Sequence, residues 1–321
     1  MRGASHVRSG LENQDAIGWL PPDGVGSTII MSVADGHSDA RCFRSATGAR
    51  FAIEVSHALA EALVANDFSK EDLTLVKRIV DADVAKHIVR SWRHRVEEDI
   101  VEHPFREEEL AQATSRETPA ESSQPDADPA LAYGTTLITA VVTASFMALW
   151  QIGDGDIVAV TDDGRVERAV PHLPGLLGNE TMSLCSEEAW RYFNVVVTGT
   201  PPPLVLISTD GFANSFKDES GFLQFGSDVM GLLSTEGFGA VNGRLAGWLT
   251  EMSQVASGDD ISLGMIVHPD LITSTGGAAT TSRPGHVGEA VSSTPAAPQE
   301  DPEQGPDCSP AVSDAEARGS G

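Results

Sequence analysis

Two apolar runs in the sequence each end in an Asp-Gly dipeptide, and this pattern could support metal-assisted chemistry. The first run is Thr28–His37 (TIIMSVADGH), which delivers Asp35, and the second is Leu204–Gly211 (LVLISTDG), which delivers Asp210. A short run of β-branched and apolar residues before a turn signal is typical of a buried strand. Two such strands would bring two carboxylates together, and like charges at close range require a cation.

The dipeptide alone is weak evidence, because Asp-Gly is also a common hairpin turn. The sequence contains it at Asp23, Asp35, Asp154, Asp163 and Asp210. Asp23 and Asp163 lie between a polar flank and a new strand, so we interpret both as turns. Asp35 and Asp210 end the two most apolar strands, so they are the candidate site residues.

The composition excludes several classes of function. With 321 residues and 40% hydrophobic content, the chain can bury a core in one large domain. A net charge of −26 argues against binding to nucleic acid or to an anionic membrane. Three unevenly spaced cysteines, Cys42, Cys185 and Cys308, make neither a disulfide framework nor a zinc site, which favours a reducing compartment.

Two further observations favour a soluble, cytoplasmic protein. The opening MRGASHVRSG lacks the apolar segment of a secretory signal. The longest apolar stretch, Leu137–Ile152, is too short and too polar to span a membrane, so we expect two successive strands there.

The elements that must position these residues follow from the apolar periodicity. Residues 1–20 are expected to be strand or loop. Helices are predicted at Gly48–Ala65, from Asp72 to about Glu102, at Ser227–Leu233 and at Phe238–Val255. Further strands are predicted at Tyr133–Val142, Ser145–Ile152, Ile157–Val160, Arg165–Val170, Leu204–Ser208 and Ile261–Val267. Strands that follow one another directly favour antiparallel sheets.

Three segments are predicted to be irregular. Residues 103–130 are rich in Glu, Pro, Ala and Ser and indicate a mobile surface insertion. Residues 171–200 form a long connection, which we interpret as a substrate-facing flap. Residues 271–321 contain no aromatic side chain and cannot form a core, so we expect a disordered acidic tail.

Six short motifs occur along the chain in a fixed order: Asp15 in Asn-Gln-Asp, Asp35-Gly36-His37, Gly134-Thr135-Thr136, Gly153-Asp154-Gly155, Asp210-Gly211 and Asp259-Asp260. In this order and context, the chain resembles the metal-dependent protein phosphatases of type 2C. The form SHVRSGLENQDA is most similar to the bacterial branch. The resemblance implies an α+β fold, a four-layer α-β-β-α sandwich of two antiparallel sheets flanked by helices, in a catalytic domain of residues 1–270.

The resemblance also implies a set of metal ligands. Two Mn²⁺ or Mg²⁺ ions would be bridged by Asp35 and bound by the Gly36 carbonyl, Asp210 and Asp259. Asp15 would support them, and Asp154 would help to hold a weaker third ion. Carboxylate and carbonyl oxygens are the ligands that such hard cations prefer.

The implied reaction is the hydrolysis of phosphoserine or phosphothreonine in a protein substrate. A water or hydroxide that bridges the two ions would attack, and His37 would protonate the leaving alkoxide. The partner would be a phosphoprotein made by an opposing Ser/Thr kinase, and we expect the phosphatase to be a monomer. Gly134-Thr135-Thr136 is expected to be structural, because small residues let neighbouring backbone approach closely.

The sequence departs from the family pattern in four places. Gly10 stands where many relatives carry an Arg that grips the phosphate, and Arg8 is the candidate replacement. Gln14 replaces a Glu, Gly155 a common Ser and Asp260 a common Asn, and we expect little effect from these three.

Three other functions are weighed against that of an active metal-dependent phosphatase. A phosphatase-like domain that binds a phosphoprotein with little turnover would explain Gly10. An acidic nucleotide-binding or structural protein has little support, since no G-x-x-x-x-G-K-[ST] loop occurs. Cys185 and Arg191 match the C-x5-R spacing of cysteine-dependent phosphatases, but Glu187 and Glu188 would repel a phosphate there.

Overall fold

The computed structural model describes residues 1–66, 68, 72–114, 125, 128–171 and 182–272. These residues lie in one compact unit, Met1–Gly288. Almost all of the predicted tail and part of the predicted insertion lie outside the described residues.

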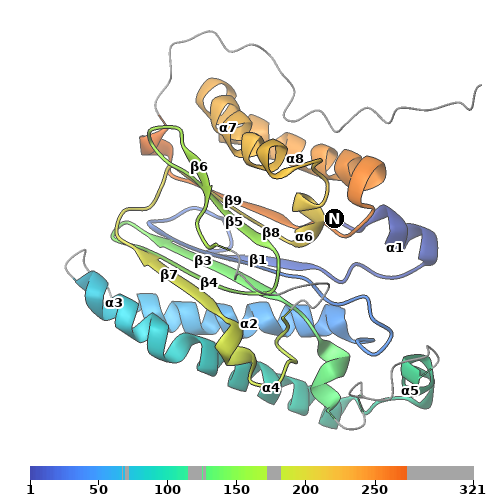
Figure 1. Cartoon of the computed structure of the whole chain (residues 1–321). Coiled ribbons are helices and arrows are strands. Elements are labelled where there is room, and N and C mark those ends of the chain that lie inside the picture. The colour runs from blue at the N-terminus through green and yellow to red at the C-terminus, as the bar shows by residue number, and fades with distance from the viewer. Residues whose placement is uncertain (67, 69–71, 115–124, 126–127, 172–181, 273–321) are drawn as a thin grey trace, which may run out of the picture. The chain divides into compact units, whose positions relative to one another are not determined.

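The strands form two antiparallel sheets (Figure 1). The first sheet has the order β1-β2-β3-β4-β7 and the second has the order β6-β5-β8-β9. The first comprises β1 Ala16–Leu20, β2 Thr28–Ala34, β3 Leu137–Thr143, β4 Met147–Ile152 and β7 Asn194–Thr198. The second comprises β5 Asp156–Val160, β6 Val166–Arg168, β8 Leu204–Ser208 and β9 Leu263–Val267.

Helices cover the outer face of each sheet (Figure 1). The first sheet is covered by α2 Ser45–Val64, α3 Leu73–Ile79 and α4 Ala85–Glu102, the last two joined by a π-helical turn at Val80–Val84. The second is covered by α7 Glu219–Glu236 and α8 Phe238–Met252, which continues as a π-helical turn, Ser253–Ser257. The shorter helices are α1 Ala4–Ser9, α5 Glu107–Thr114 and α6 Asp210–Ala213, with 3₁₀ turns at Pro129–Tyr133, Ala189–Tyr192 and Pro269–Leu271.

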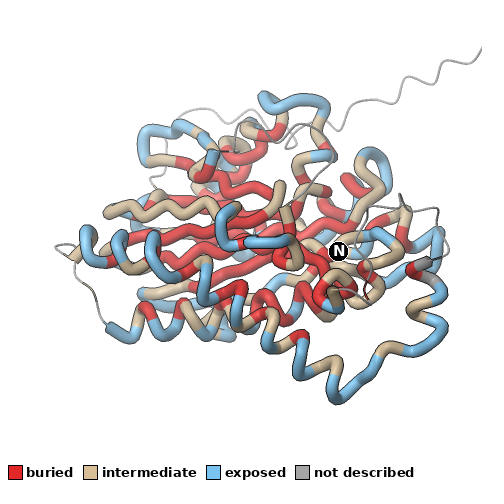
Figure 2. The backbone as a smooth tube through the Cα atoms, turned by 60° about the horizontal axis from the view of Figure 1, so that its bottom comes forward, coloured by how far each residue is buried: buried red, intermediate tan, exposed pale blue. Residues whose placement is uncertain are grey.

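Three apolar clusters hold the four layers together. One lies between the first sheet and its helices and includes Trp92 and Trp150, and another lies between the second sheet and α7 and α8. The third lies between the two sheets and includes Leu149 and Ile207. Figure 2 shows that burial is most continuous along the strands. The predicted four-layer α-β-β-α sandwich is therefore confirmed.

The antiparallel connections bring several strand ends to one place. In the first sheet, the end of β2 lies beside the start of β3, since Val33 pairs with Ile138. In the second sheet, the end of β8 lies beside the starts of β5 and β9, because Ser208 pairs with both Asp156 and Leu263. The residues just outside these ends carry the six motifs.

The structure corrects four predictions of local structure. Residues 4–9 form helix α1, whereas strand or loop was expected. Within the predicted insertion, α5 is helical, and within the predicted flap, β7 is an edge strand paired with β4. The predicted helix Ser227–Leu233 begins earlier, at Glu219, where Asp218 accepts a hydrogen bond from the Gly221 N–H as an N-cap.

Candidate active site

Asp35 is held by the backbone at the end of β2. The Asp35 carbonyl accepts hydrogen bonds from the Thr136 N–H at 2.8 Å and from Thr135 Oγ1 at 2.9 Å. The Asp35 N–H donates to Thr136 Oγ1 at 3.0 Å. The predicted structural role of Gly134-Thr135-Thr136 is therefore confirmed, because these threonines hold the Asp35 backbone by both its donor and its acceptor.

The carboxyl groups from distant parts of the sequence lie close together. The side chains of Asp15, Asp210 and Asp259 are near enough to Asp35 for their charges to act on its carboxyl group. Burial, followed by the charges of Asp15 and Asp210, raises the pKa of Asp35 well above its ordinary value, and Asp259 adds to the effect. Burial also raises the pKa of Asp210, with contributions from Asp154 and Asp259 that the neighbouring Asp35 carboxyl group partly offsets. The five predicted acidic residues thus form one electrostatic cluster.

Asp15 is the most constrained member of this cluster. Its side chain is 9% exposed, and Oδ2 accepts a hydrogen bond from Thr209 Oγ1 at 2.8 Å. Among the described residues, its buried Oδ1 has no hydrogen-bond partner. Burial raises the pKa of Asp15 to about 7, the bonds to Thr209 and Ser262 oppose this, and the Asp260 charge adds to it. A buried carboxylate oxygen without a donor is a site where a cation would be favourable.

Glycines allow the backbone to pack tightly at two of these positions. A Cβ on Gly36 would lie 2.8 Å from the Gln14 carbonyl oxygen and 2.9 Å from Ser45. A Cβ on Gly211 would lie 2.1 Å from the Asp260 carbonyl oxygen. Both contacts are with rigid groups, so only glycine fits directly after Asp35 and Asp210.

Asp260 has a role that the sequence analysis did not identify. Its side chain is 3% exposed and accepts from the Gly3 N–H at 2.5 Å, the Gln14 N–H at 2.7 Å and His6 Nδ1 at 2.9 Å. It therefore joins α1, the loop before β1 and the loop before β9. The signals available in the sequence were the Ser-His of SHVRSG and the second Asp of Asp259-Asp260, but nothing in them indicated the pairing.

We expect Asp260→Ala to destabilise the protein by about 3 kcal/mol or more, because the buried His6 ring and two backbone N–H groups would lose their acceptor. Asp260→Asn keeps one acceptor oxygen and should cost less. Urea denaturation of the metal-free protein measures both. Equal stability of the alanine variant and the wild type would contradict this role.

His37 lies at the edge of the acidic cluster. Its N–H donates to the Gly134 carbonyl at 3.1 Å, and its carbonyl accepts from Gln14 Nε2 at 3.4 Å. Burial lowers the pKa of the imidazole, while the charges of Asp154 and Asp39 act in the opposite direction. The structure thus brings His37 to the cluster, and its role in proton transfer stays a prediction.

The position of Gly10 has a backbone explanation. Gly10 caps α1 with φ +77°, a left-handed conformation that favours glycine over arginine. Arg8 lies two residues earlier, in the last turn of α1, and is exposed, and its Nη2 is 4.0 Å from where a Cβ on Gly258 would stand. Since Gly258 precedes Asp259, Arg8 lies beside the loop that carries one of the acidic residues. Its contact with phosphate remains a prediction.

The residues present fit divalent cations by their chemistry. All donors in the cluster are oxygens, several carboxyl groups raise one another's pKa, and a buried Asp15 oxygen has no donor. Within the described part of the chain, no three His, Cys, Asp or Glu side chains are arranged as a ready metal-binding group. Cation binding would therefore require the carboxyl groups of this cluster to move closer together than they lie in this structure.

The cysteine-phosphatase alternative is contradicted by the structure. Burial raises the pKa of Cys185, and the Arg191 guanidinium pairs with Glu188 at 2.8 Å. The cysteine of such a phosphatase must be a thiolate at neutral pH and must lie in positive surroundings to bind a phosphate, so the C-x5-R spacing is coincidental.

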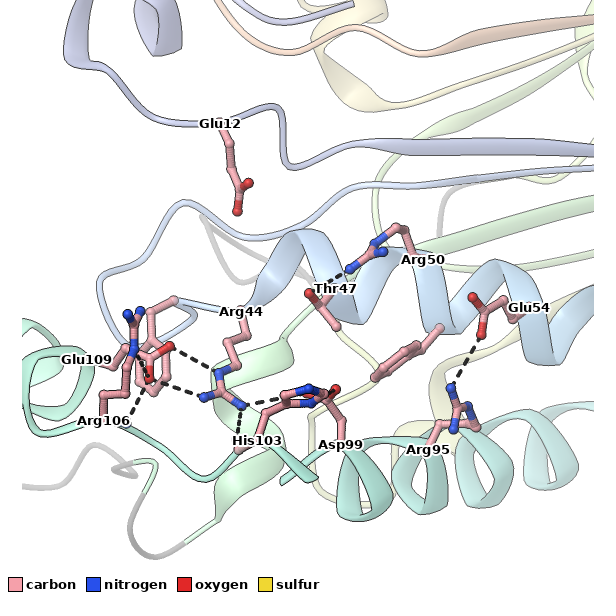
Figure 3. Close-up of a pocket in the computed structure, with 12 residues that line it drawn as sticks. Glu12, Arg44, Thr47, Arg50, Glu54, Arg95, Asp99, His103, Arg106 and Glu109 are labelled. Atoms are coloured by element: carbon pink, nitrogen blue, oxygen red, sulfur yellow. Dashed lines mark hydrogen bonds and ion pairs between the residues drawn. The ribbon is translucent and has the colours of Figure 1, made fainter. Parts of the chain in front are cut away.

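A separate polar pocket lies over α2, α4 and α5 and contains none of the predicted site residues (Figure 3). At its centre Arg44 donates to Tyr133 Oη at 2.8 Å and to the His103 carbonyl at 2.6 Å, and it pairs with Glu109 at 3.1 Å. These contacts attach α5 to the end of α4. They explain why part of the predicted mobile insertion is an ordered helix.

The comparisons with known proteins give a family and a set of similar folds. A family model described as protein phosphatase 2C matches residues 2–250. No curated protein sequence matches the chain. Among the described residues, no helix has the length and apolar character needed to cross a bilayer.

Solved structures similar to this chain include several bacterial phosphatases. The serine/threonine phosphatase Stp1 from Staphylococcus aureus is 14% identical, with 80% of this chain and 89% of that chain covered and a TM-score of 0.49. The catalytic domain of the serine/threonine phosphatase PstP, in complex with two manganese ions, is 16% identical. The match covers 79% of this chain and 90% of that chain, with a TM-score of 0.45. PppA, a key regulatory component of T6SS in Pseudomonas aeruginosa, is 14% identical. The match covers 79% of this chain and 90% of that chain, with a TM-score of 0.46.

Proposed function

This chain belongs to the protein phosphatase 2C family, and we propose that it is a metal-dependent phosphoserine/phosphothreonine protein phosphatase. The observation that carries the proposal is that the Asp35 carboxyl group lies among those of Asp15, Asp210 and Asp259, and that the buried Asp15 Oδ1 has no hydrogen-bond partner among the described residues. These carboxyl groups come from distant parts of the sequence, and burial raises the pKa of three of them, Asp15, Asp35 and Asp210. Such a site is suited to cations.

Asp35, the Gly36 carbonyl, Asp210 and Asp259 would hold two Mn²⁺ or Mg²⁺ ions, with Asp15 supporting them and Asp154 contributing to a weaker third. When bound, the ions supply positive charge to the phosphate and lower the pKa of the attacking water. The threonines at positions 135 and 136 fix the Asp35 backbone, from which this carboxylate would reach the ions. Arg8 would add a donor for phosphate from α1.

The test is a metal-dependence assay with a phosphothreonine peptide. We expect hydrolysis that requires added Mn²⁺ or Mg²⁺ and stops when EDTA is added, because the proposed reaction uses water that the ions activate. Hydrolysis that continues in EDTA would contradict the metal requirement. Tight metal binding with no hydrolysis of any phosphopeptide would favour the phosphoprotein-binding alternative that Gly10 suggested.

His37→Gln separates proton donation from the other steps. We expect it to slow hydrolysis of a phosphothreonine peptide by roughly 100-fold, because the alkoxide must be protonated as it leaves. Hydrolysis of p-nitrophenyl phosphate should change little, since nitrophenolate leaves without a proton. Steady-state rates on both substrates measure the difference. An equal loss on both substrates would exclude His37 as the proton donor.

A further inference from the structure

Three side chains from distant parts of the sequence meet over the backbone of Gly134. A Cβ on Gly134 would lie 2.9 Å from Cδ2 of His37, 3.1 Å from Sγ of Cys42 and 3.2 Å from Sγ of Cys185. The two sulfur atoms are therefore no further apart than the sum of the last two distances. The charge of Cys185 also contributes to the pKa of Cys42, which is an independent sign that the thiols are neighbours.

Both thiols are free, and both lie outside helices and strands. Cys42 precedes α2 and is 3% exposed, and its N–H donates to the Asp39 carbonyl at 2.9 Å. Cys185 is partly exposed; its Sγ–H donates to Ser183 Oγ at 3.2 Å, and its carbonyl accepts from Arg93 Nη2 at 3.0 Å. Cys185 is thus the more exposed residue of the two, and Cys42 is the buried one.

We propose that Cys42 and Cys185 are a redox-active pair that a hydroperoxide converts into a disulfide beside His37, and that this disulfide lowers the activity of the site. The Cys185 thiol is oxidised first: its sulfur gains the hydroxyl of hydrogen peroxide, and one water leaves. The Cys42 sulfur then attacks the sulfenic acid, the S–S bond forms, and a second water leaves. The two thiols supply the two electrons that reduce the peroxide.

The surroundings of Cys42 and Cys185 determine how fast the two thiols react with peroxide. Burial, and then the neighbouring Cys185, raises the pKa of Cys42 to about 12, and burial also raises the pKa of Cys185. Both thiols are therefore protonated at neutral pH, and the thiolate is the reactive form. The pair responds slowly, to sustained rather than brief exposure to peroxide, and faster as the pH rises.

The effect on activity follows from the position of the bond and rests on the proposed function. Bond formation draws the two sulfurs together to about 2 Å, which shifts the loops on either side of Gly134. His37 contacts the same glycine, and Gly134 begins the segment that holds the Asp35 backbone. A small displacement of catalytic groups lowers rates steeply, so we expect a loss of about tenfold or more.

Peptide mapping tests the bond without using the activity. The full-length, metal-free protein is treated with hydrogen peroxide, the peroxide is removed with catalase, free thiols are alkylated, and the unreduced digest is analysed by mass spectrometry. We expect a linked Cys42–Cys185 peptide that disappears after dithiothreitol. Cys308→Ser, which removes the remaining cysteine of the sequence, should leave the link intact. Oxidation of both thiols to sulfinic or sulfonic acids without the link would overturn the proposal, and so would a link to Cys308.

The effect of the disulfide on phosphatase activity is tested with Cys185→Ser and Cys42→Ser. Reduced Cys185→Ser should hydrolyse phosphopeptide as the wild type does and should resist peroxide, whereas the oxidised wild type should regain activity in dithiothreitol. If Cys42→Ser does not fold, Cys185→Ser alone decides the question. Full activity of the linked protein would overturn the inhibitory role. A linked protein that lacks phosphatase activity even when reduced would support the thiol pair and contradict the proposed function instead.

Discussion

Replacing Asp35 by Asn is expected to lower phosphatase activity by on the order of 1,000-fold or more while leaving the fold intact. Asn has nearly the same shape as Asp, and the backbone contacts that hold residue 35 come from its carbonyl and N–H, which the substitution preserves. Asn is neutral at every pH, so it avoids the repulsion from Asp15, Asp210 and Asp259 that Asp35 meets when it ionises. The metal-free variant should therefore be as stable as the wild type or more stable.

Two measurements on the same preparation separate function from folding. Hydrolysis of a phosphothreonine peptide in Mn²⁺ gives the activity, and thermal unfolding with and without Mn²⁺ gives stability and metal binding. The variant should lose most of the stabilisation that Mn²⁺ gives the wild type. Asp23→Asn is the matched control, because Asp23-Gly24 is the same dipeptide in the exposed β1–β2 turn. Wild-type activity in Asp35→Asn would show that the two-metal assignment is wrong.

The metal-free protein should lose stability as the pH rises from about pH 4 to about pH 7. Burial and neighbouring carboxyl groups raise the pKa of Asp15 to about 7 and raise those of Asp35 and Asp210, whereas each has an ordinary value of 3.8. Between these values, the folded protein retains protons that the unfolded chain has released. The free energy of unfolding therefore falls with rising pH across this window, by on the order of a few kcal/mol.

Divalent cations should reverse this dependence, because they compete with protons for the same carboxylates. We expect Mn²⁺ to stabilise the protein strongly at about pH 8 and little at about pH 5. Thermal unfolding across the pH range, in EDTA and in Mn²⁺, measures both curves. Asp15→Asn should flatten the EDTA curve, since it removes one of the shifted groups. A melting temperature in EDTA that rises steadily through this window would contradict the carboxylate cluster.

The sequence alone was enough to predict the elements whose structure depends on residues that are close together in the chain. The apolar runs before Asp35 and Asp210 predicted β2 and β8, because a buried strand needs continuous apolar side chains. The periodic apolar residues of 72–102 predicted the long helical segment that contains α4. The order of the six motifs predicted the family and the sandwich fold, and both are confirmed.

Only the tertiary structure decided the features that depend on residues distant in sequence. The residues of β7, with four consecutive β-branched side chains at 195–198, favour a strand, but only the fold shows that β4 is its partner. The residues of α5 favour a helix, but only the fold shows that Arg44 holds it through Glu109. The buried Asp260 contacts residues near the N-terminus, and Cys42 meets Cys185 over Gly134. Periodicity reports which face of an element is buried, but not which other element buries it. These long-range pairings therefore had to be read from the fold.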